Sequence, residues 1–348
     1  MLFRSVSYRV DVLRHGAKFS ELRWLKDSAP DVLVDATGSI MGSLGGTFLH
    51  NPDIEYLSDE LQPVLELDGQ EYPLGVYRIT TYTDTVGAQG HFIRLDAYDR
   101  SWMMQTIKTE GILHLAAGTN YLTAVQQLMT QAGIGLVIAT PTNETLQTDR
   151  EDWQEGTDYL TICNQLLGEI NYKPVWFDGS GIGHLEPKAT PNAANIRWRY
   201  SSTDIRLLSP VSRDMSQEQD IFDAPNVFVA ICSNPDLATP LVARAGNNSP
   251  SSSISIFKRG QRITQVVKVD NIASQEALQA YVDDLCFQSQ LGTRTITFYG
   301  LPEGGHGVGD VLSIDAPEFG GIYEETSWRL RLSPGELMTH TAKRTVIA

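Results

Sequence analysis

Hydrophobic and polar residues alternate along the first third of the chain, which is the pattern of half-buried β-strands. Asp68-Gly69 is a strong hairpin signal, because both central positions of the tight turn need a positive φ. Pro73 is expected at a strand edge, since it has no N–H to donate. Strands are predicted at residues 8–13, 31–35, 43–49, 61–67, 72–82 and 91–99. Residues 1–112 are therefore predicted to form a β domain.

The pattern changes at two stretches that repeat one another. Positions 118–138 and 156–176 share eight identities in 21. Each copy reads as a small polar cap, an amphipathic helix with apolar residues three and four apart, and a short apolar strand. Thr119 or Asn120 caps the first helix and Asp158 the second. A solenoid needs at least three repeats, so residues 113–190 are predicted to be one α+β module, with a further strand near 182–185.

The remaining chain, residues 191–348, returns to β-structure with one helix at about 274–288. Strands are predicted at residues 226–231, 295–299, 310–314 and 326–332, with a last strand after the Pro334-Gly335 turn that ends at Ala348. Residues 247–253 are rich in Asn, Ser and Pro and predict an exposed mobile loop. The predicted fold class is α+β, mainly β.

Composition limits what this chain can do. Of its 348 residues, 41% are hydrophobic and 20% are charged, which is typical of a globular protein. The net charge of −15 argues against a surface that grips nucleic acid, because phosphate binding needs clustered Lys and Arg. The acidity either serves solubility or lines a passage for another polyanion.

Cysteines and apolar runs indicate the compartment. Cys163, Cys232 and Cys286 lie in apolar runs and show no CxxC spacing, which predicts buried thiols in a reducing compartment. We expect no signal peptide and no stable membrane insertion, since no run approaches the roughly 20 apolar residues of a spanning helix.

Signatures of catalysis are missing. There is no GxSxG elbow, Walker loop or HExxH motif. The glycine-rich run at residues 304–309 precedes a strand rather than a helix, so it is interpreted as a turn and not a phosphate loop. No catalytic, cofactor or metal site is therefore predicted, and the protein is expected not to be an enzyme.

Some acidic residues and histidines stand close together in the sequence. Asp96 with Asp99, and Glu324 with Glu325, are carboxylate pairs of the kind that glycosidases use, but solvated surface is the expected role of each pair, because a chain with 42 acidic residues contains such pairs by chance. His184 and Glu186 share a strand face, but two ligands alone do not make a metal site. Five other histidines have no suitably spaced partner: His15, His50, His91, His114 and His340.

Tryptophans could line a sugar-binding groove or pack inside the protein. Those beside or within predicted elements are Trp102, Trp153, Trp176, Trp198 and Trp328. Core or subunit-interface packing is the more frequent use of such side chains.

Several short motifs resemble, in their order, the hub proteins of phage tails. Leu67-Asp68-Gly69, the run 72–79 and the run 94–100 resemble the first barrel of the baseplate hub and tail-tip proteins of tailed phages and prophages. The twin Gly-Thr-x-Tyr-Leu-Thr helices resemble the α/β module inserted after that barrel. The runs 222–227, 233–235, 269–274 and 309–311, with the closing hairpin at Trp328, resemble the second half of the family.

This resemblance implies two tail-tube-like β-barrel domains, residues 1–112 and 191–348, around the α+β insertion. It further implies a homotrimer whose barrels form a pseudo-sixfold ring that continues the tail tube and passes DNA through its lumen without specific binding. The implied partners are a distal tail or tail-tube protein, the tape measure protein and tail fibre or spike proteins. Such proteins assemble in the host cytoplasm and function in the virion.

Two other functions remain open from the sequence. The first is a carbohydrate- or receptor-binding tail protein, for which saturable glycan binding lost on replacement of an exposed Trp would be evidence. The second is a tail-associated cell-wall hydrolase, for which cell-wall clearing abolished by a single Asp or Glu substitution would be evidence.

Overall fold

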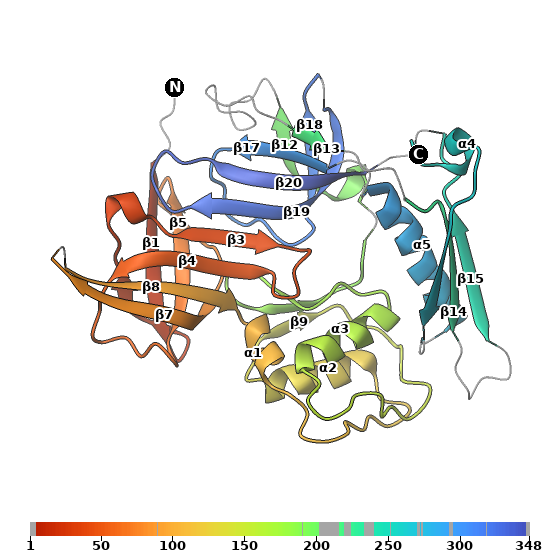
Figure 1. Cartoon of the computed structure of the whole chain (residues 1–348), viewed down its shortest axis with the longest axis horizontal. Helices are drawn as coiled ribbons and strands as arrows, with labels where there is room; N and C mark the ends of the chain where they lie inside the picture. Colours follow the sequence, from red (N-terminus) through yellow and green to blue (C-terminus); the bar gives the residue numbers. More distant parts are fainter. Residues whose placement is uncertain are drawn as a thin grey trace.

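The computed structural model shows a mainly β protein with a helical module and a smaller sheet-and-helix unit at its sides (Figure 1). It describes residues 5–345 except 89, 190, 202–215, 219–223, 233–239, 251, 270–271, 273, 292–294 and 318. The end of the last predicted strand, 346–348, lies outside the described residues. None of the described helices is long and apolar enough to span a bilayer.

Strands make up most of the regular structure. They are β1 (Val6–Arg14), β2 (Ala17–Leu22), β3 (Asp31–Asp35), β4 (Gly42–Leu49), β5 (Glu60–Leu67), β6 (Gln70–Pro73), β7 (Tyr77–Gly87), β8 (Gly90–Asp99), β9 (Val137–Ala139), β10 (Trp176–Phe177), β11 (Gly183–Leu185), β12 (Ile196–Ser201), β13 (Ser216–Glu218), β14 (Val227–Cys232), β15 (Leu241–Gly246), β16 (Thr264–Val269), β17 (Thr295–Gly300), β18 (Val311–Asp315), β19 (Gly321–Arg331) and β20 (Met338–Thr345). The helices are α1 (Ser101–Thr106), α2 (Tyr121–Gln131), α3 (Tyr159–Glu169), α4 (Ile256–Arg259) and α5 (Gln275–Leu291), with 3-10 turns at Lys26–Ser28 and Ala193–Asn195.

One large sheet joins the two ends of the described chain. Its strand order is β13-β17-β20-β19-β3-β4-β8-β7-β5-β1-β2, and β12, β18 and β6 pair alongside this path. The antiparallel contact between β3 and β19 connects the first β region to the last hairpin. Trp328, Leu330 and Met338 accordingly pack in the same core as Val10, Phe48 and other residues of the first region.

The hairpin signal at Asp68-Gly69 is confirmed. Asp68 has a φ of 51° and Gly69 a φ of 82°, and the turn joins β5 to β6. The predicted return strand at 72–82 is wrong in its middle, because β6 ends at Pro73 and β7 begins at Tyr77. Gly75, at a φ of 129°, turns the chain here, and the Tyr77 ring fills the space that a side chain at Gly75 would need. Alternation alone does not reveal such a break.

The α+β module begins its two long helices as the repeat predicts. The Asn120 side chain accepts hydrogen bonds from the Leu122 and Thr123 backbone, and Asp158 accepts one from Thr161 at 2.8 Å. Gly133 and Asn171, 38 positions apart, both have the positive φ that ends a helix. The strands that follow differ: β9 pairs with β11 in parallel and β10 pairs with it antiparallel.

The smaller unit consists of α5 packed on the sheet β15-β14-β16. Leu278, Val282 and Cys286 of the helix contact Phe228 and its neighbours on β14, as the predicted apolar stripe requires. All three cysteines of the chain are buried, as predicted, and none forms a disulfide.

The predicted loop at 247–253 is exposed at Asn248 and Pro250, but it is anchored by buried residues on both sides of them. Asn247 and Ser252 are buried and bonded to each other at 2.7 Å. Buried Asn226 donates to the carbonyl oxygens of Ile254 and Gln261, and its own oxygen accepts from Ile263. Hydrogen bonds of buried amide side chains hold this segment in place. A prediction from composition, which counts Asn and Ser as loop residues, cannot detect these bonds.

Candidate functional site

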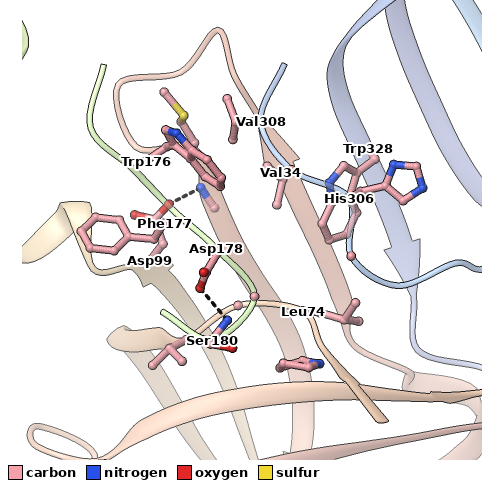
Figure 2. A pocket seen from close by; sticks show the side chains of 18 of the residues that line it. Val34, Leu74, Asp99, Trp176, Phe177, Asp178, Ser180, His306, Val308 and Trp328 are labelled. Atoms are coloured by element: carbon pink, nitrogen blue, oxygen red, sulfur yellow. Dashed lines mark hydrogen bonds between the residues drawn. The ribbon is translucent and has the colours of Figure 1, made fainter. Parts of the chain in front are cut away.

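A cavity of about 300 Å³ lies where three parts of the chain meet (Figure 2). The β6–β7 bend forms one wall, β10 and the turn after it form another, and the 303–308 loop with β19 completes it. Figure 2 shows Trp176 and Trp328 on different walls, each carried by a different element. The aromatic residues of the lining are Tyr72, Tyr77, Trp176, Phe177, His184, His306 and Trp328.

Two hydrogen bonds hold the turn after β10 in place beside the β6–β7 bend. The Gly75 N–H donates to the Gly179 carbonyl oxygen at 3.0 Å, and the Arg100 guanidinium donates to the Gly181 carbonyl oxygen at 2.9 Å. A Cβ atom added at Gly179 would lie 2.1 Å from the carbonyl oxygen of Pro73. Glycine is therefore required here for the α+β module to dock on the sheet.

His184, on β11, contacts this turn, whereas Glu186 pairs with a different residue. Its Nε2 is 3.0 Å from Asp178 Oδ2, and its ring stacks on Trp176 with the centroids 4.3 Å apart. Asp178 also accepts a hydrogen bond from the Ser180 backbone (Figure 2). It accepts another from the Ile182 backbone. Glu186 instead pairs with Lys173 at 2.8 Å. The two candidates therefore have different polar partners, although both line the hollow beside Val308.

Asp99 and Asp96 point to opposite sides of β8, as their spacing predicts. Asp99 is buried and accepts hydrogen bonds from the backbone N–H groups of Gly42 at 2.6 Å and Ser101 at 2.9 Å. Burial raises the pKa of Asp99, and these hydrogen bonds oppose that shift. The side chain thus fixes β4 and the start of α1, and the two carboxylates do not form a pair.

His306, Glu325 and His340 form a buried cluster next to the cavity. Glu325 Oε2 lies 2.7 Å from His306 Nδ1, and Glu325 Oε1 lies 2.6 Å from His340 Nδ1. The glutamate and His340 are 2% and 0% exposed. Trp198 stacks on His306 and Phe298 stacks on His340, which closes the cluster on both sides.

Burial and charge act against each other in this cluster. Burial alone would raise the pKa of Glu325, but the charge of His306 and hydrogen bonds from both histidines outweigh it and hold that pKa at about 2. Burial lowers the pKa of His340, and its hydrogen bond to Glu325 only partly compensates. Among the described residues, His340 Nε2 has no hydrogen-bond partner. The cluster is therefore an ionised carboxylate bracketed by two imidazole donors.

Sequence spacing could not have found this cluster. The glycine-rich run at 304–309, predicted to be a turn, carries the His306 side chain inward. In the sequence, the acidic neighbour of Glu325 is Glu324. A bulge between Glu325 and Ser327 shifts the register of β19 against β20, so that Glu325 rather than Thr326 pairs with Ala342, two positions from His340.

Comparison with solved structures identifies the fold. Over 98% of this chain and 97% of the other, it superposes on a tail protein from Neisseria meningitidis MC58 with a TM-score of 0.69 and 14% identity. A 43 kDa tail protein of prophage MuSo2 from Shewanella oneidensis matches at a TM-score of 0.67 and 9% identity, over 97% and 98% of the two chains. Prophage tail protein gp18 from Listeria monocytogenes EGD-e matches at 0.59 and 13% identity, over 96% and 94%.

This is a phage tail-protein fold. No protein-family model and no curated protein sequence matches the chain. The likeness suggested by the ordered motifs is thus confirmed at the level of the fold. Of those motifs, residues 222–223, 233–235, 270–271 and 273 lie outside the described residues.

In this tail-protein fold the cavity has aromatic walls, and its two aspartates already accept hydrogen bonds from the protein. The carboxylates of Asp99 and Asp178 are occupied by backbone N–H groups. Trp153, Trp176 and Trp328 are buried, as the packing interpretation of the tryptophans predicts. The indole N–H groups of Trp176 and Trp328 have no acceptor among the described residues.

A second histidine cluster lies on the surface, away from the cavity residues. His50, Asp84 and His91 each have a possible ligand atom within 4.8 Å of the others. His50 and His91, which lack suitable spacing in the sequence, meet because β4 and β8 are neighbours in the sheet. The sequence alone does not give the order of the strands in the sheet, so it could not predict this cluster.

Proposed function

We propose that this protein is a structural, non-enzymatic hub of a phage tail tip or baseplate. Three copies would form a ring that continues the tail tube and lets DNA pass. The distal tail or tail-tube protein, the tape measure protein and the fibre or spike proteins would be its neighbours in the virion.

The observation that carries this proposal is the end-to-end match to tail proteins. The chain and the Neisseria tail protein each align over at least 97% of their length, so the likeness includes the sheet, the α+β module and the smaller unit together. A fold shared over one domain only would support much less, because single folds host many functions.

The sheet β15-β14-β16 offers a surface for contact between copies. Its face opposite α5, here called the outer sheet face, consists of Val229, Ile231, Val242, Arg244, Val266 and Lys268. Val266 is 57% and Val242 38% exposed. In Figure 1 this sheet forms one end of the molecule, with α5 between it and the other parts.

Charge favours a second copy as the occupant of the outer sheet face. The three strands contain two basic side chains and no acidic one, whereas the whole chain carries a net charge of −15. Among the described residues, neither Arg244 nor Lys268 has an ion-pair partner. An apolar face with a basic rim therefore fits an acid-bearing surface of another copy in a head-to-tail contact.

Two measurements test the hub. The mass of the purified protein in solution should include a trimer at high concentration. Images of assembled particles should place the chain on the tail axis, and a position away from that axis would exclude the hub. The same images reveal the neighbouring proteins, so they test the proposed partners together with the hub proposal.

Glycan binding is a second candidate, favoured by the aromatic cavity between Trp176 and Trp328. It predicts saturable binding of a cell-surface glycan by the isolated protein, weakened by Trp176→Ala. Absence of binding to host glycans would contradict this candidate. The cavity would then be only a gap in the packing between the α+β module and the large sheet.

A further inference from the structure

Three neighbouring strands bring two histidines and an aspartate to one place on the surface. His50 directly follows β4, and its backbone N–H donates to the carbonyl oxygen of His91 on β8 at 3.0 Å. Asp84 lies on β7, which pairs with the other side of β8. The side chains of Asp84 and His91 are hydrogen-bonded to each other. The strands fix the positions of all three backbones.

We propose that His50, Asp84 and His91 bind a transition-metal cation that favours nitrogen ligands, such as Zn²⁺ or Ni²⁺. Imidazole nitrogen and carboxylate oxygen both bind Zn²⁺ at about 2.0–2.2 Å. Ca²⁺ and Mg²⁺ prefer sites built from oxygen atoms alone. Three protein ligands leave at least one position for water. This site is independent of the hub function and assigns the cluster a role beyond it.

The cluster is accessible and can adjust. The side chains of His91 and Asp84 are 36% and 47% exposed. The two imidazole rings now stack with centroids 3.7 Å apart and 13° between their planes. A metal ion lies in the plane of each imidazole that binds it, so both rings must turn toward one point. His50 Nδ1 has no hydrogen-bond partner among the described residues, so no such bond at that atom resists the turn.

The buried cluster of His306, Glu325 and His340 is less suited to a metal. Its carboxylate oxygens already lie 2.7 Å and 2.6 Å from the histidine nitrogens. Ligands around a tetrahedral zinc ion with bonds of about 2.0–2.1 Å are about 3.3 Å apart. Entry of a metal would therefore require a packed core to expand.

Nearby charges modify the surface site without blocking it. Lys18 and Arg23 lie in the hollow beside His50 and would repel a cation. Lys18 is neutralised by Asp11 at 2.8 Å and by Glu21 at 2.6 Å. The carboxylate of Asp84 supplies the negative charge that the two neutral imidazoles lack.

A bound ion would join β4, β8 and β7 through side chains. The β7–β8 hairpin is exposed beyond this point, with Val86 78% exposed. We therefore expect Zn²⁺ to slow amide hydrogen exchange at residues 82–87 relative to the chelated protein, and to leave exchange in α2 and α3 unchanged.

Calorimetric titration of the untagged full chain with Zn²⁺ tests the site. We expect about one ion per chain and no heat from Ca²⁺ under the same conditions. His50→Gln and His91→Gln should each weaken Zn²⁺ binding by at least about tenfold. His114→Gln is the matched control, because His114 is also an exposed histidine beside a carboxylate, Glu151, at 3.1 Å, and it should change nothing.

Either of two results would overturn the inference. One is that wild-type protein binds no Zn²⁺ at submillimolar concentration. The other is that the His50→Gln/His91→Gln double variant keeps wild-type affinity, which would mean adventitious binding elsewhere. Melting curves in chelator verify that the variants are folded. Neither result bears on oligomeric state or tail position, so the hub proposal is judged separately.

Discussion

Two adjacent glutamates on β19 show how strongly the surroundings decide the behaviour of one residue type. Glu325 faces the buried histidines, which hold its pKa at about 2. Glu324 has its pKa raised by burial, and the charge of Lys173 only partly offsets this. The charged form is thus stabilised at one position and disfavoured at the next.

Replacing these glutamates by glutamine should have different effects. Glu325→Gln removes a buried charge and leaves two histidine donors poorly matched, so we expect a loss of about 3 kcal/mol in the free energy of unfolding. Glu324→Gln, the matched control, should change it by less than about 0.5 kcal/mol. Urea unfolding at pH 7.5 measures both. Equal losses would contradict the electrostatic account of the cluster.

The same cluster should make the fold sensitive to acid. The pKa of His340 is lowered by folding, so the unfolded chain binds the proton more tightly, and stability falls as pH drops below about 6.5. The pKa of Glu325 is also lowered, so its contribution is present above about pH 4.3 and is lost toward its folded value of about 2. Both groups therefore destabilise the fold on acidification.

Urea unfolding at pH 7.5 and 5.5 isolates the histidine part of this effect. His340→Gln should reduce the difference in unfolding free energy between the two pH values. His114→Gln, at an exposed position, should leave that difference as in wild type. A wild-type pH dependence in His340→Gln would mean that other groups control the acid response.

At the scale of elements, the contact between the turn after β10 and the β6–β7 bend depends on Gly179. Gly179→Ala would place a Cβ atom 2.1 Å from the Pro73 carbonyl oxygen, so the turn or the bend must move. We expect a loss of at least about 2 kcal/mol in thermal or urea unfolding.

Gly168→Ala is the control for that substitution. Gly168 lies within α3, and nothing approaches its added Cβ within 4 Å. Alanine favours the helix over glycine, so this variant should be more stable than wild type by about 0.5–1 kcal/mol. If both alanine variants behaved alike, steric contact at Gly179 would not be the cause.

The local pattern of hydrophobic and polar residues predicted most helices and strands. It did not predict which strands pair with each other or where a strand is interrupted. Most strands of the first region, the caps at Asn120 and Asp158 and the stripe of α5 follow from periodicity and turn chemistry, whereas β2 was not predicted. The short helices α1 and α4 and the break at Gly75 do not, because each depends on what packs beside it. The histidine clusters could not be predicted either, since they arise from pairing between distant strands and from one bulge.

At the scale of the whole molecule, the outer sheet face gives a direct test of assembly. Arg244→Glu/Lys268→Glu reverses both basic charges on this face and should shift the mass distribution toward monomer. Lys26→Glu/Lys108→Glu makes the same change in net charge at exposed positions elsewhere and should leave assembly unaffected. Mass measurement over a range of concentrations distinguishes them.

Two outcomes would count against this use of the outer sheet face. If the charge-reversed variant assembled as well as wild type, the contact between copies would lie elsewhere. If wild-type protein stayed monomeric at every concentration, the outer sheet face would not hold copies together in solution, and particle images alone would decide the hub proposal.

The pairing of β3 with β19 has a consequence for how the protein is made. Asp31 and Arg329, which form an ion pair across this contact, are 298 positions apart in the chain. At about 5–20 residues per second, a ribosome synthesises β19 on the order of 15 to 60 s after β3. During that delay the edge of β3 that β19 covers is open to other strands, while α2 and α3 can already pack against each other. Nascent chains waiting for β19 thus carry an unpaired strand edge, the feature that favours pairing with other chains and aggregation.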